Sequence, residues 1–223
     1  MNIGAFTGRA EAYAKARPGY PDEAVEYIRT LIPPNAVFAD IGAGTGILTA
    51  LIARYGYEIF AIEPNRDMLE QLAKTIAPFP NVKIFDGTAE STKLPSNCVD
   101  VIINAQALKR FDIEKFRAEC LRIGKSNHIV ITVFNGGIEA NTGYEKATGA
   151  LYQNPVVKKF FNPLSFTREK WHLYYASMEG VPLKGDVRYD AWITELNAKF
   201  DCCNEDGVLH KDEITYVYSG EIA

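Results

Sequence analysis

The fold is decided by the segment Asp40-Ile41-Gly42-Ala43-Gly44-Thr45-Gly46. It ends the short apolar run 36–41, and apolar residues at helical spacing begin directly after it at Ile47. Glycine permits positive φ angles and lets a ligand approach the backbone closely. In an open α/β sheet the ligand crevice lies beyond the carboxyl ends of the strands, which is where this segment falls. The sequence therefore predicts a ligand-binding loop between a buried strand and a helix.

Strand-like and helix-like segments alternate on both sides of this loop. The strand-like runs are 36–41, 58–62, 82–85, 99–103 and 128–134. The helix-like segments are 22–32, 47–55, 67–77 and 113–123, and Asp112 is well placed to cap the last of them. This alternation predicts a parallel, doubly wound sheet with helices on both faces.

The pattern changes after Asn135. Residues 136–205 hold few strand-like runs and many aromatic side chains, so we expect a largely helical insertion there. Residues 213–222 alternate and are rich in Thr, Tyr and Val, which predicts a closing antiparallel strand. The expected fold class is α/β: a doubly wound, mostly parallel, seven-stranded Rossmann-like sheet with an antiparallel C-terminal strand and a helical lid insertion.

The composition of the 223 residues excludes several classes of protein. Hydrophobic residues make up 47% and charged residues 23%, which is ordinary for a globular chain and not for a disordered one. The net charge of -4 disfavours a protein that mainly coats nucleic acid. No apolar run is long enough to span a membrane. The four cysteines and three histidines show no metal-ligand spacing, so we expect reduced thiols, no metal and a cytoplasmic location.

Two ligand classes compete for the glycine loop. A dinucleotide site has the pattern G-x-G-x-x-G, and its third glycine position is taken here by Ile47. Asp40, two residues before the first glycine, suits a ligand with an ammonium group better than one with a pyrophosphate. Glu63 ends the next strand-like run, where a carboxylate can accept hydrogen bonds from both ribose hydroxyls. These residues favour a zwitterionic nucleoside, although the glycines alone would also suit a simple tight turn.

With these residues in place, the sequence resembles the class I S-adenosylmethionine-dependent methyltransferases, in their small-molecule type 11 group. The resemblance covers nearly the whole chain. Its motifs are Asp40-x-Gly42-x-Gly44-x-Gly46, Glu63-Pro64, Gly87-Thr88-Ala89-Glu90 followed by Leu94-Pro95, and Asp100 to Ala107. The opening Tyr13-x-x-x-Arg17-Pro18-x-Tyr20-Pro21 is similar to one bacterial subgroup.

The resemblance implies S-adenosyl-L-methionine as the cofactor and assigns residues to each part of it. The methionine part is expected on the backbone of Gly42, Ala43, Gly44 and Gly46, with Asp40 at its amino group. The remaining contacts are expected from Glu63 at the ribose, Pro64 and Met68 on the adenine, Thr88, Ala89 and Glu90 at the adenine edge, Asn104 and Ala105 near the sulfonium, and Tyr13 and Arg17 over the cofactor. We expect one domain over 1–223, with an N-terminal helical segment 1–35 over the cofactor and a mostly helical lid at 136–205.

Methyl transfer is an in-line displacement at a carbon that a sulfonium has already activated, so an enzyme mainly positions the reactants and excludes water. Many relatives carry His followed by an aromatic after the fourth motif, whereas this chain has Lys109-Arg110. An ammonium beside a sulfonium is unfavourable unless an acidic substrate lies between them. We therefore expect an anionic small-molecule acceptor, with Lys109 as the candidate catalytic residue. The alternative is a non-catalytic S-adenosylmethionine-binding protein, a degenerate methyltransferase in which these two cations are simply solvated.

Overall fold

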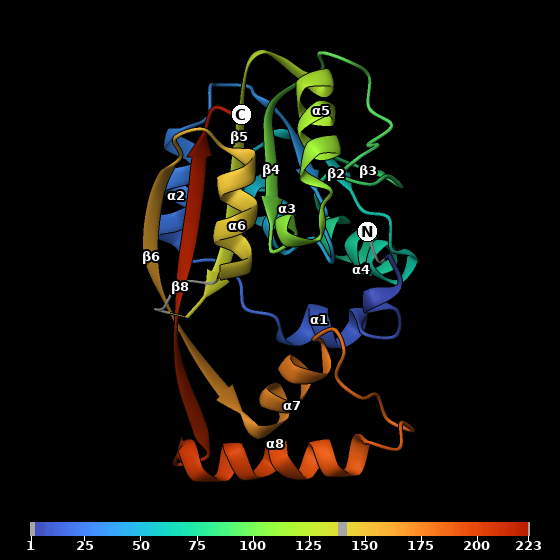
Figure 1. Ribbon diagram of the computed structural model, residues 1–223, viewed down its shortest axis with the longest axis vertical. Coiled ribbons are helices and arrows are strands. Elements are labelled where there is room, and N and C mark those ends of the chain that lie inside the picture. Colours follow the sequence, from blue (N-terminus) through green and yellow to red (C-terminus); the bar gives the residue numbers. More distant parts are fainter. Residues whose placement is uncertain (1–2, 138–141, 223) are drawn as a thin grey trace.

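The computed structural model describes residues 3–137 and 142–222 and has one mixed sheet at its centre (Figure 1). The strands are β1 (Val37–Ile41), β2 (Glu58–Ile62), β3 (Val82–Phe85), β4 (Val99–Ala105), β5 (Gly124–Gly136), β6 (Val156–Thr167), β7 (Asn204–Glu205) and β8 (Val208–Gly220). They are hydrogen-bonded in the order β3-β2-β1-β4-β5-β8-β6, and β7 pairs with β8 beside this path. The pairs from β3 to β5 are parallel, whereas β8 is antiparallel to β5 and β6. The expected α/β class and doubly wound, mostly parallel sheet are confirmed.

Helices cover both faces of the sheet. The helical elements are η1 (Ile3–Phe6), α1 (Ala10–Ala16), α2 (Asp22–Thr30), α3 (Ile47–Ala53), α4 (Arg66–Ile76), η2 (Leu108–Arg110), α5 (Ile113–Ile123), α6 (Thr142–Leu151), α7 (Arg168–Ala176) and α8 (Tyr189–Cys203). Apolar residues of α2, α3 and α4 share one buried cluster with Phe38 of β1, and those of α5 and α6 share another with Ile41. Side chains of a strand alternate between its two faces. Asp40 therefore points to the side of α3, where its carboxylate accepts a hydrogen bond from Thr49.

Local sequence signals explain where several elements begin. The side chain of Asp112 accepts a hydrogen bond from the backbone N–H of Lys115 at 3.3 Å, so the predicted cap of α5 is present. Asn65 caps α4 in the same way by accepting from the N–H of Met68 at 3.0 Å. Both caps fix a helix directly after a strand or loop on the carboxyl side of the sheet, where the candidate site lies.

The long edge strand β6 differs from the expectation for residues 136–205. That region contains three helices, α6 to α8, but Val156–Thr167 pairs with β8 over its whole length. The run carries two adjacent lysines and a proline, and both of its faces have exposed side chains, so it lacks the apolar alternation of a half-buried strand. Proline is tolerated because β6 is at the sheet edge. With β6 the path has seven strands, and the two-residue β7 adds an eighth.

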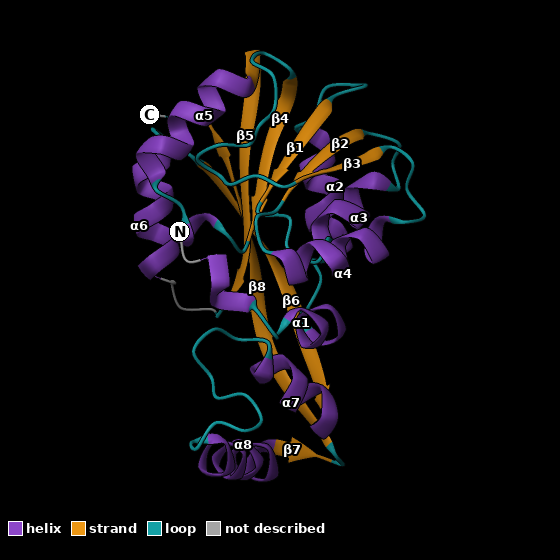
Figure 2. Ribbon diagram, turned by 90° about the vertical axis from the view of Figure 1, so that its right-hand side faces the viewer, coloured by secondary structure: helices purple, strands orange, loops and turns teal. Residues whose placement is uncertain are grey.

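Residues 164–211 extend beyond the parallel strands and form a second, smaller core, which we call the cap (Figure 2). Its buried side chains come from the far ends of β6 and β8 and from α7 and α8; they are Phe166, Trp171, Tyr174, Leu196, Phe200 and Leu209. The short helices η1 and α1 lie between the sheet and the cap, and α1 contacts both α4 and α7 (Figure 1). Within the described ranges, every helix is too short or too polar to cross a membrane.

Candidate active site

The three glycines of the loop between β1 and α3 have different physical roles. All three have positive φ angles, of 73° at Gly42, 58° at Gly44 and 86° at Gly46. A Cβ on Gly42 would lie 2.9 Å from the Cβ of Ala107, and one on Gly46 would lie 2.7 Å from Leu72 Cδ1. A Cβ on Gly44 would meet nothing closer than 4.0 Å. Gly42 and Gly46 therefore let the loop pack against its neighbours, whereas Gly44 faces open space.

The loop is anchored to the end of β2. The backbone N–H groups of Gly42 and Ala43 both donate to the carbonyl of Ile62, at 2.9 and 3.0 Å. The N–H of Gly44 donates to Glu63 Oε2 at 2.9 Å, and Glu63 Oε1 accepts from the N–H of Asn65 at 2.8 Å. Burial raises the pKa of Glu63, an effect that these two hydrogen bonds oppose. Each carboxylate oxygen can accept a further hydrogen bond, so Glu63 can still bind two hydroxyls.

Asp40 is buried and only partly satisfied by the protein. Its Oδ2 accepts a hydrogen bond from Thr49 Oγ1 at 2.6 Å, whereas its buried Oδ1 has no partner. The hydroxyl of Thr45 is likewise buried without a partner. Burial raises the pKa of Asp40 to about 6. Buried polar groups are nearly always hydrogen-bonded, so two orphaned oxygens on one loop indicate a place for a donor-rich ligand.

Two adjoining cavities meet at this loop. The larger one, of about 370 Å³, extends from the loop to the cap and includes both Asp40 and Thr45. The smaller one, of about 70 Å³, is lined by Glu63 and mostly by apolar groups, with Asn65, Gln106 and Arg110 as its other polar residues. Tyr13, Gly42 and Gly44 line both cavities. The larger cavity thus offers polar groups and the smaller one offers a carboxylate beside an apolar slot, which fits an amino-acid part joined to a nucleoside.

Most of the residues predicted from sequence lie on these walls. Those of the larger cavity are Tyr13, Arg17, Asp40, Gly42, Ala43, Gly44, Ala105 and Lys109. Those of the smaller one are Tyr13, Gly42, Gly44, Glu63, Pro64, Met68, Ala89 and Ala105. The structure therefore brings together residues that are 96 positions apart in sequence, from Tyr13 to Lys109.

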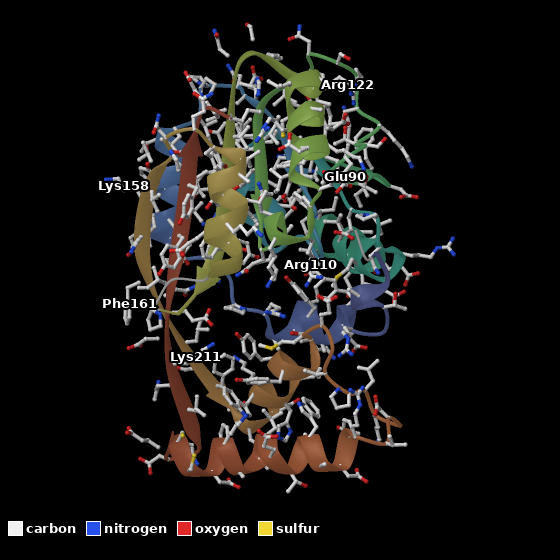
Figure 3. All side chains as sticks on the ribbon, in the orientation of Figure 1. Glu90, Arg110, Arg122, Lys158, Phe161 and Lys211 are labelled. Carbon is white, nitrogen blue, oxygen red and sulfur yellow. The ribbon has the colours of Figure 1, made fainter. Side chains whose placement is uncertain are left out.

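Four predicted residues do not line either cavity. Gly46 packs against α4, as described above. Asn104 is fully buried on the opposite face of β4, where its Nδ2 donates to Thr132 Oγ1 at 3.0 Å. The backbone of Thr88 forms a bridge to Ser91. Glu90 accepts a hydrogen bond from the N–H of Asp112 at 3.0 Å and lies beside α5 in Figure 3. In this structure these four residues lie outside the walls of both cavities.

The segment from Tyr13 to Tyr20 closes one side of the larger cavity. The guanidinium of Arg17 lies over the rings of Tyr13 and Tyr174, at 4.9 and 5.3 Å from their centroids. Its Nε donates to Ser177 Oγ at 2.9 Å. The carbonyl of Gly19 accepts hydrogen bonds from Asn135 Nδ2 and Asn162 Nδ2, at 3.0 and 3.3 Å. The segment is therefore held from both the sheet and the cap.

Gln106 and Tyr144 are site residues that the sequence did not single out. Gln106 has a φ of 59°, unusual for a non-glycine residue, and it lines both cavities. Its Oε1 accepts from the hydroxyl of Tyr144 at 3.2 Å. Tyr144 stacks on Phe134 with ring centroids 4.1 Å apart, and burial raises the pKa of its hydroxyl. The position of Gln106 directly after a buried strand was the available signal, because such positions point into the ligand crevice.

The larger cavity also contains cationic side chains. Lys109 Nζ lies 5.3 Å from the centroid of the Tyr144 ring and makes no ion pair within the described part of the chain. Desolvation, and then the nearby charges of Arg110 and Arg17, lower the pKa of Lys109. Arg110 donates from Nη1 to Glu179 Oε2 at 2.6 Å. Among residues 3–137 and 142–222, no group of three His, Cys, Asp or Glu side chains could hold a metal ion.

Comparison with known proteins identifies the family. A family model described as a methyltransferase domain matches residues 39–132. A Mycobacterium bovis protein named as an uncharacterized methyltransferase is 31% identical over 171 residues, covering 75% of this chain and 68% of that protein.

Solved structures share the fold. The YcgJ protein of Bacillus subtilis is 17% identical with a TM-score of 0.61, covering 91% of this chain and 98% of its own. Phosphoethanolamine N-methyltransferase 2 of Haemonchus contortus, solved with phosphomonomethylethanolamine and S-adenosylhomocysteine, is 13% identical with a TM-score of 0.55; the match covers 98% of this chain and 57% of that one. Together with the motifs in their order along the sheet, the domain match and the mycobacterial relative show that the chain belongs to the S-adenosylmethionine-dependent methyltransferase family.

Proposed function

We propose that this chain transfers a methyl group from S-adenosylmethionine to a small, anionic acceptor bound between the glycine loop and the cap. The proposal that the acceptor is anionic rests on the charge of the larger cavity. Lys109 and the terminal nitrogens of Arg17 face it without a carboxylate partner within the described residues. The carboxylates of Glu179 and Glu213 that also line the cavity are already paired, with Arg110 and Lys211. Asp40 also lines the cavity, but its carboxylate is assigned below to the amino group of the cofactor, so the charge left for the acceptor is positive.

The cofactor fits the unsatisfied groups of the site. Its amino group would donate to Asp40 Oδ1 and Thr45 Oγ1, two buried oxygens of the larger cavity that lack a partner. Glu63 would accept from the ribose hydroxyls, and Pro64 and Met68 would pack on the adenine. When bound, S-adenosylmethionine supplies a methyl group on a positively charged sulfur. A 2′-phosphate at Glu63 would be repelled, which disfavours one class of dinucleotide.

The chain's own residues mainly bind the two reactants, orient them and shield them from water. Lys109 and Arg17 would hold the anionic group of the acceptor, which removes the repulsion that two cations would exert on a nearby sulfonium. The rings of Tyr13 and Tyr174 line the larger cavity on the side of the cap, where they would shield the reactants from water. Holding two reactants in the right geometry can contribute about 7–11 kcal/mol. A dedicated base is not required when the attacking atom arrives without a proton to lose.

A comparison of matched acceptors tests this proposal. The protein is incubated with methyl-labelled S-adenosylmethionine and with carboxylic acids or phosphate monoesters, each beside its neutral amide or alcohol. We expect methylation of acids over their neutral counterparts. Lys109→Met should raise the KM of an accepted acid by about 10-fold or more, the value of a lost charge-assisted hydrogen bond. Lys115→Met, which removes an exposed lysine paired with Asp112, is the control. Equal use of neutral acceptors would refute the anionic class, and binding of S-adenosylhomocysteine without any turnover would favour the non-catalytic alternative.

The Haemonchus contortus protein, which shares the fold, was solved in complex with phosphomonomethylethanolamine and S-adenosylhomocysteine, and this supports an acceptor that bears a phosphate. That neighbour supports the size and charge class of the acceptor and not its identity. A cytoplasmic location is part of the same proposal, and it is supported by the four cysteines, which are all free thiols.

A further inference from the structure

We infer that Arg110 fastens a movable cover over the nucleoside half of the cofactor site and thereby acts as a positioning residue for methyl transfer. This inference rests on the proposed function, because it concerns how the same site takes up its cofactor. The cover consists of two segments, residues 3–17 and residues 176–181. We call the second segment, 176–181, the strap.

The first step is the size of the smaller cavity, in which the proposed function places the nucleoside. It measures about 70 Å³, a volume that holds a few water molecules and not a nucleoside. Part of its lining therefore moves outward when a nucleoside enters. Most of the lining belongs to strand ends and the helices fixed to them. Phe6 and Tyr13 are different, because they come from η1 and α1, which lie between the sheet and the cap (Figure 1).

The second step is that this N-terminal segment and the strap form one unit. Arg9 donates from Nη1 to the carbonyl of Ala176 at 2.9 Å and from Nη2 to the carbonyl of Val181 at 2.5 Å. Arg17 donates to Ser177 Oγ at 2.9 Å. Arg9 is buried although it carries a charge, so the two carbonyls compensate its desolvation. Two arginines of the N-terminal segment thus hold the strap at both of its ends.

The third step is the connection of this unit to the sheet domain. Arg110 lies at the end of η2, directly after β4, and lines both cavities. Its guanidinium binds Glu179 of the strap at 2.6 Å and lies 4.5 Å from the centroid of the Phe6 ring. Figure 3 shows Arg110 at the boundary between the sheet domain and α1. One side chain of the sheet domain therefore contacts both parts of the cover.

The N-terminal part of the cover also contacts helix α4 of the sheet domain. The N–H of Gly8 donates to Asp67 Oδ2 at 2.7 Å, and Asn65 Nδ2 lies 3.4 Å from Thr7 Oγ1. These contacts are both on the side of α4. Arg110 instead binds Glu179 of the strap and lines the larger cavity, so release of its ion pair would free the strap while Thr7 and Gly8 still hold the N-terminal part of the cover on α4. In the closed state the guanidinium would lie over the junction of the cofactor and the acceptor.

The dissociation rate of S-adenosylhomocysteine tests the role of Arg110. We expect Arg110→Met to release it about 10-fold faster and Glu179→Gln about 3- to 5-fold faster, as for a partly exposed ion pair. Each variant should raise the KM of S-adenosylmethionine by about the same factor as its release rate. Each should change kcat by less than about 3-fold. The swapped pair Arg110→Glu with Glu179→Arg should restore much of the lost residence time. Arg54→Met, which breaks an exposed ion pair with Asp22 on the helices α2 and α3, should leave the rate unchanged.

The outcomes separate this inference from the function on which it rests. Failure of the unaltered protein to bind S-adenosylhomocysteine would refute the proposed cofactor. Wild-type release rates in Arg110→Met, or a swapped pair no better than the single variants, would overturn the inference while leaving that function intact. Hydrogen exchange provides a second measurement: S-adenosylhomocysteine should protect residues 3–17 and 176–181 together. Protection of only one of these segments would show that they do not move as one cover.

Discussion

Replacement of Asp40 by asparagine should stabilise the free protein and weaken cofactor binding. Burial raises the pKa of this carboxyl to about 6, from an ordinary value near 3.9. At about 1.4 kcal/mol for each pH unit between those values, the ionised carboxylate costs the folded protein about 3 kcal/mol at pH 7. Asparagine has the same shape and can accept the Thr49 hydrogen bond, which then loses its charge assistance at a cost of about 1 kcal/mol. The net gain is about 1–2 kcal/mol, or a Tm increase of about 2–8 °C.

The contribution of Asp40 to the free energy of unfolding changes with pH in a definite direction. An acid with a raised pKa in the folded state binds its proton more tightly there than in the unfolded chain. Its contribution to the free energy of unfolding therefore falls as the pH rises from about 4 to about 6 and stays low above that. The gain from Asp40→Asn should appear over this window and vanish below about pH 4. Thermal melts of both proteins from pH 4 to 8 measure it, with Asp206→Asn in an exposed turn as the control.

Cofactor affinity should change in the opposite direction. Only the ionised carboxylate pairs with the ammonium of the cofactor, so the Kd of S-adenosylhomocysteine in the unaltered protein should rise as the pH falls below about 6. Asp40→Asn should abolish this pH dependence and raise the Kd at pH 7 by about 10- to 100-fold, the value of a charge-assisted hydrogen bond. Calorimetry at several pH values measures both effects. A variant that is less stable at pH 7, or that keeps full affinity, would refute the role assigned to the unpartnered oxygen.

Three further substitutions and one chemical modification follow from the same geometry. Gly46→Ala places a Cβ 2.7 Å from Leu72 Cδ1 at a φ of 86°, so chemical denaturation should show a loss of about 2–4 kcal/mol. Gly44→Ala has no such clash and should lose only about 1–2 kcal/mol, while calorimetry shows the larger effect on S-adenosylhomocysteine binding; equal stability losses at the two positions would contradict their different roles. Glu63→Gln should weaken S-adenosylhomocysteine by about 10-fold or more, because an amide accepts through only one atom, and unchanged affinity would remove Glu63 from the ribose site. Cys120 is buried and its thiol pKa is raised, so iodoacetamide should modify it only after unfolding, which mass spectrometry of the digested protein measures.

The sequence alone predicted the parallel half of the sheet and the loop that organises the site. Strands β1 to β4 are short, mostly apolar runs, and β5 contains one at 129–134. Helices such as α4 and α5 show apolar spacing and a capping residue within one turn. These signals are local, since each depends on residues only a few positions apart. The glycine loop with Asp40 and Glu63 is equally local, because the strand ends that present it follow from the alternation of elements.

Only the tertiary structure decided which side of an element faces the ligand. Asn104 and Ala105 are neighbours on β4, yet one is buried against Thr132 and the other lines both cavities, because strand side chains alternate. The register of the strand against β1 and β5 sets that choice, and a motif does not encode it.

The structure also decided the edge strand β6, the cap and the cover. β6 is a strand because it pairs with β8, about 50 residues later, and its own residues lack a strand pattern. Arg9, Arg17 and Arg110 look alike in the sequence, but each finds a partner in the segment 176–181. Such contacts join residues 69 to 172 positions apart, and their energies depend on distance and burial in the folded chain. The sequence therefore predicted the chemistry of the cofactor loop. The contacts that close the site over that loop became visible only in the folded structure.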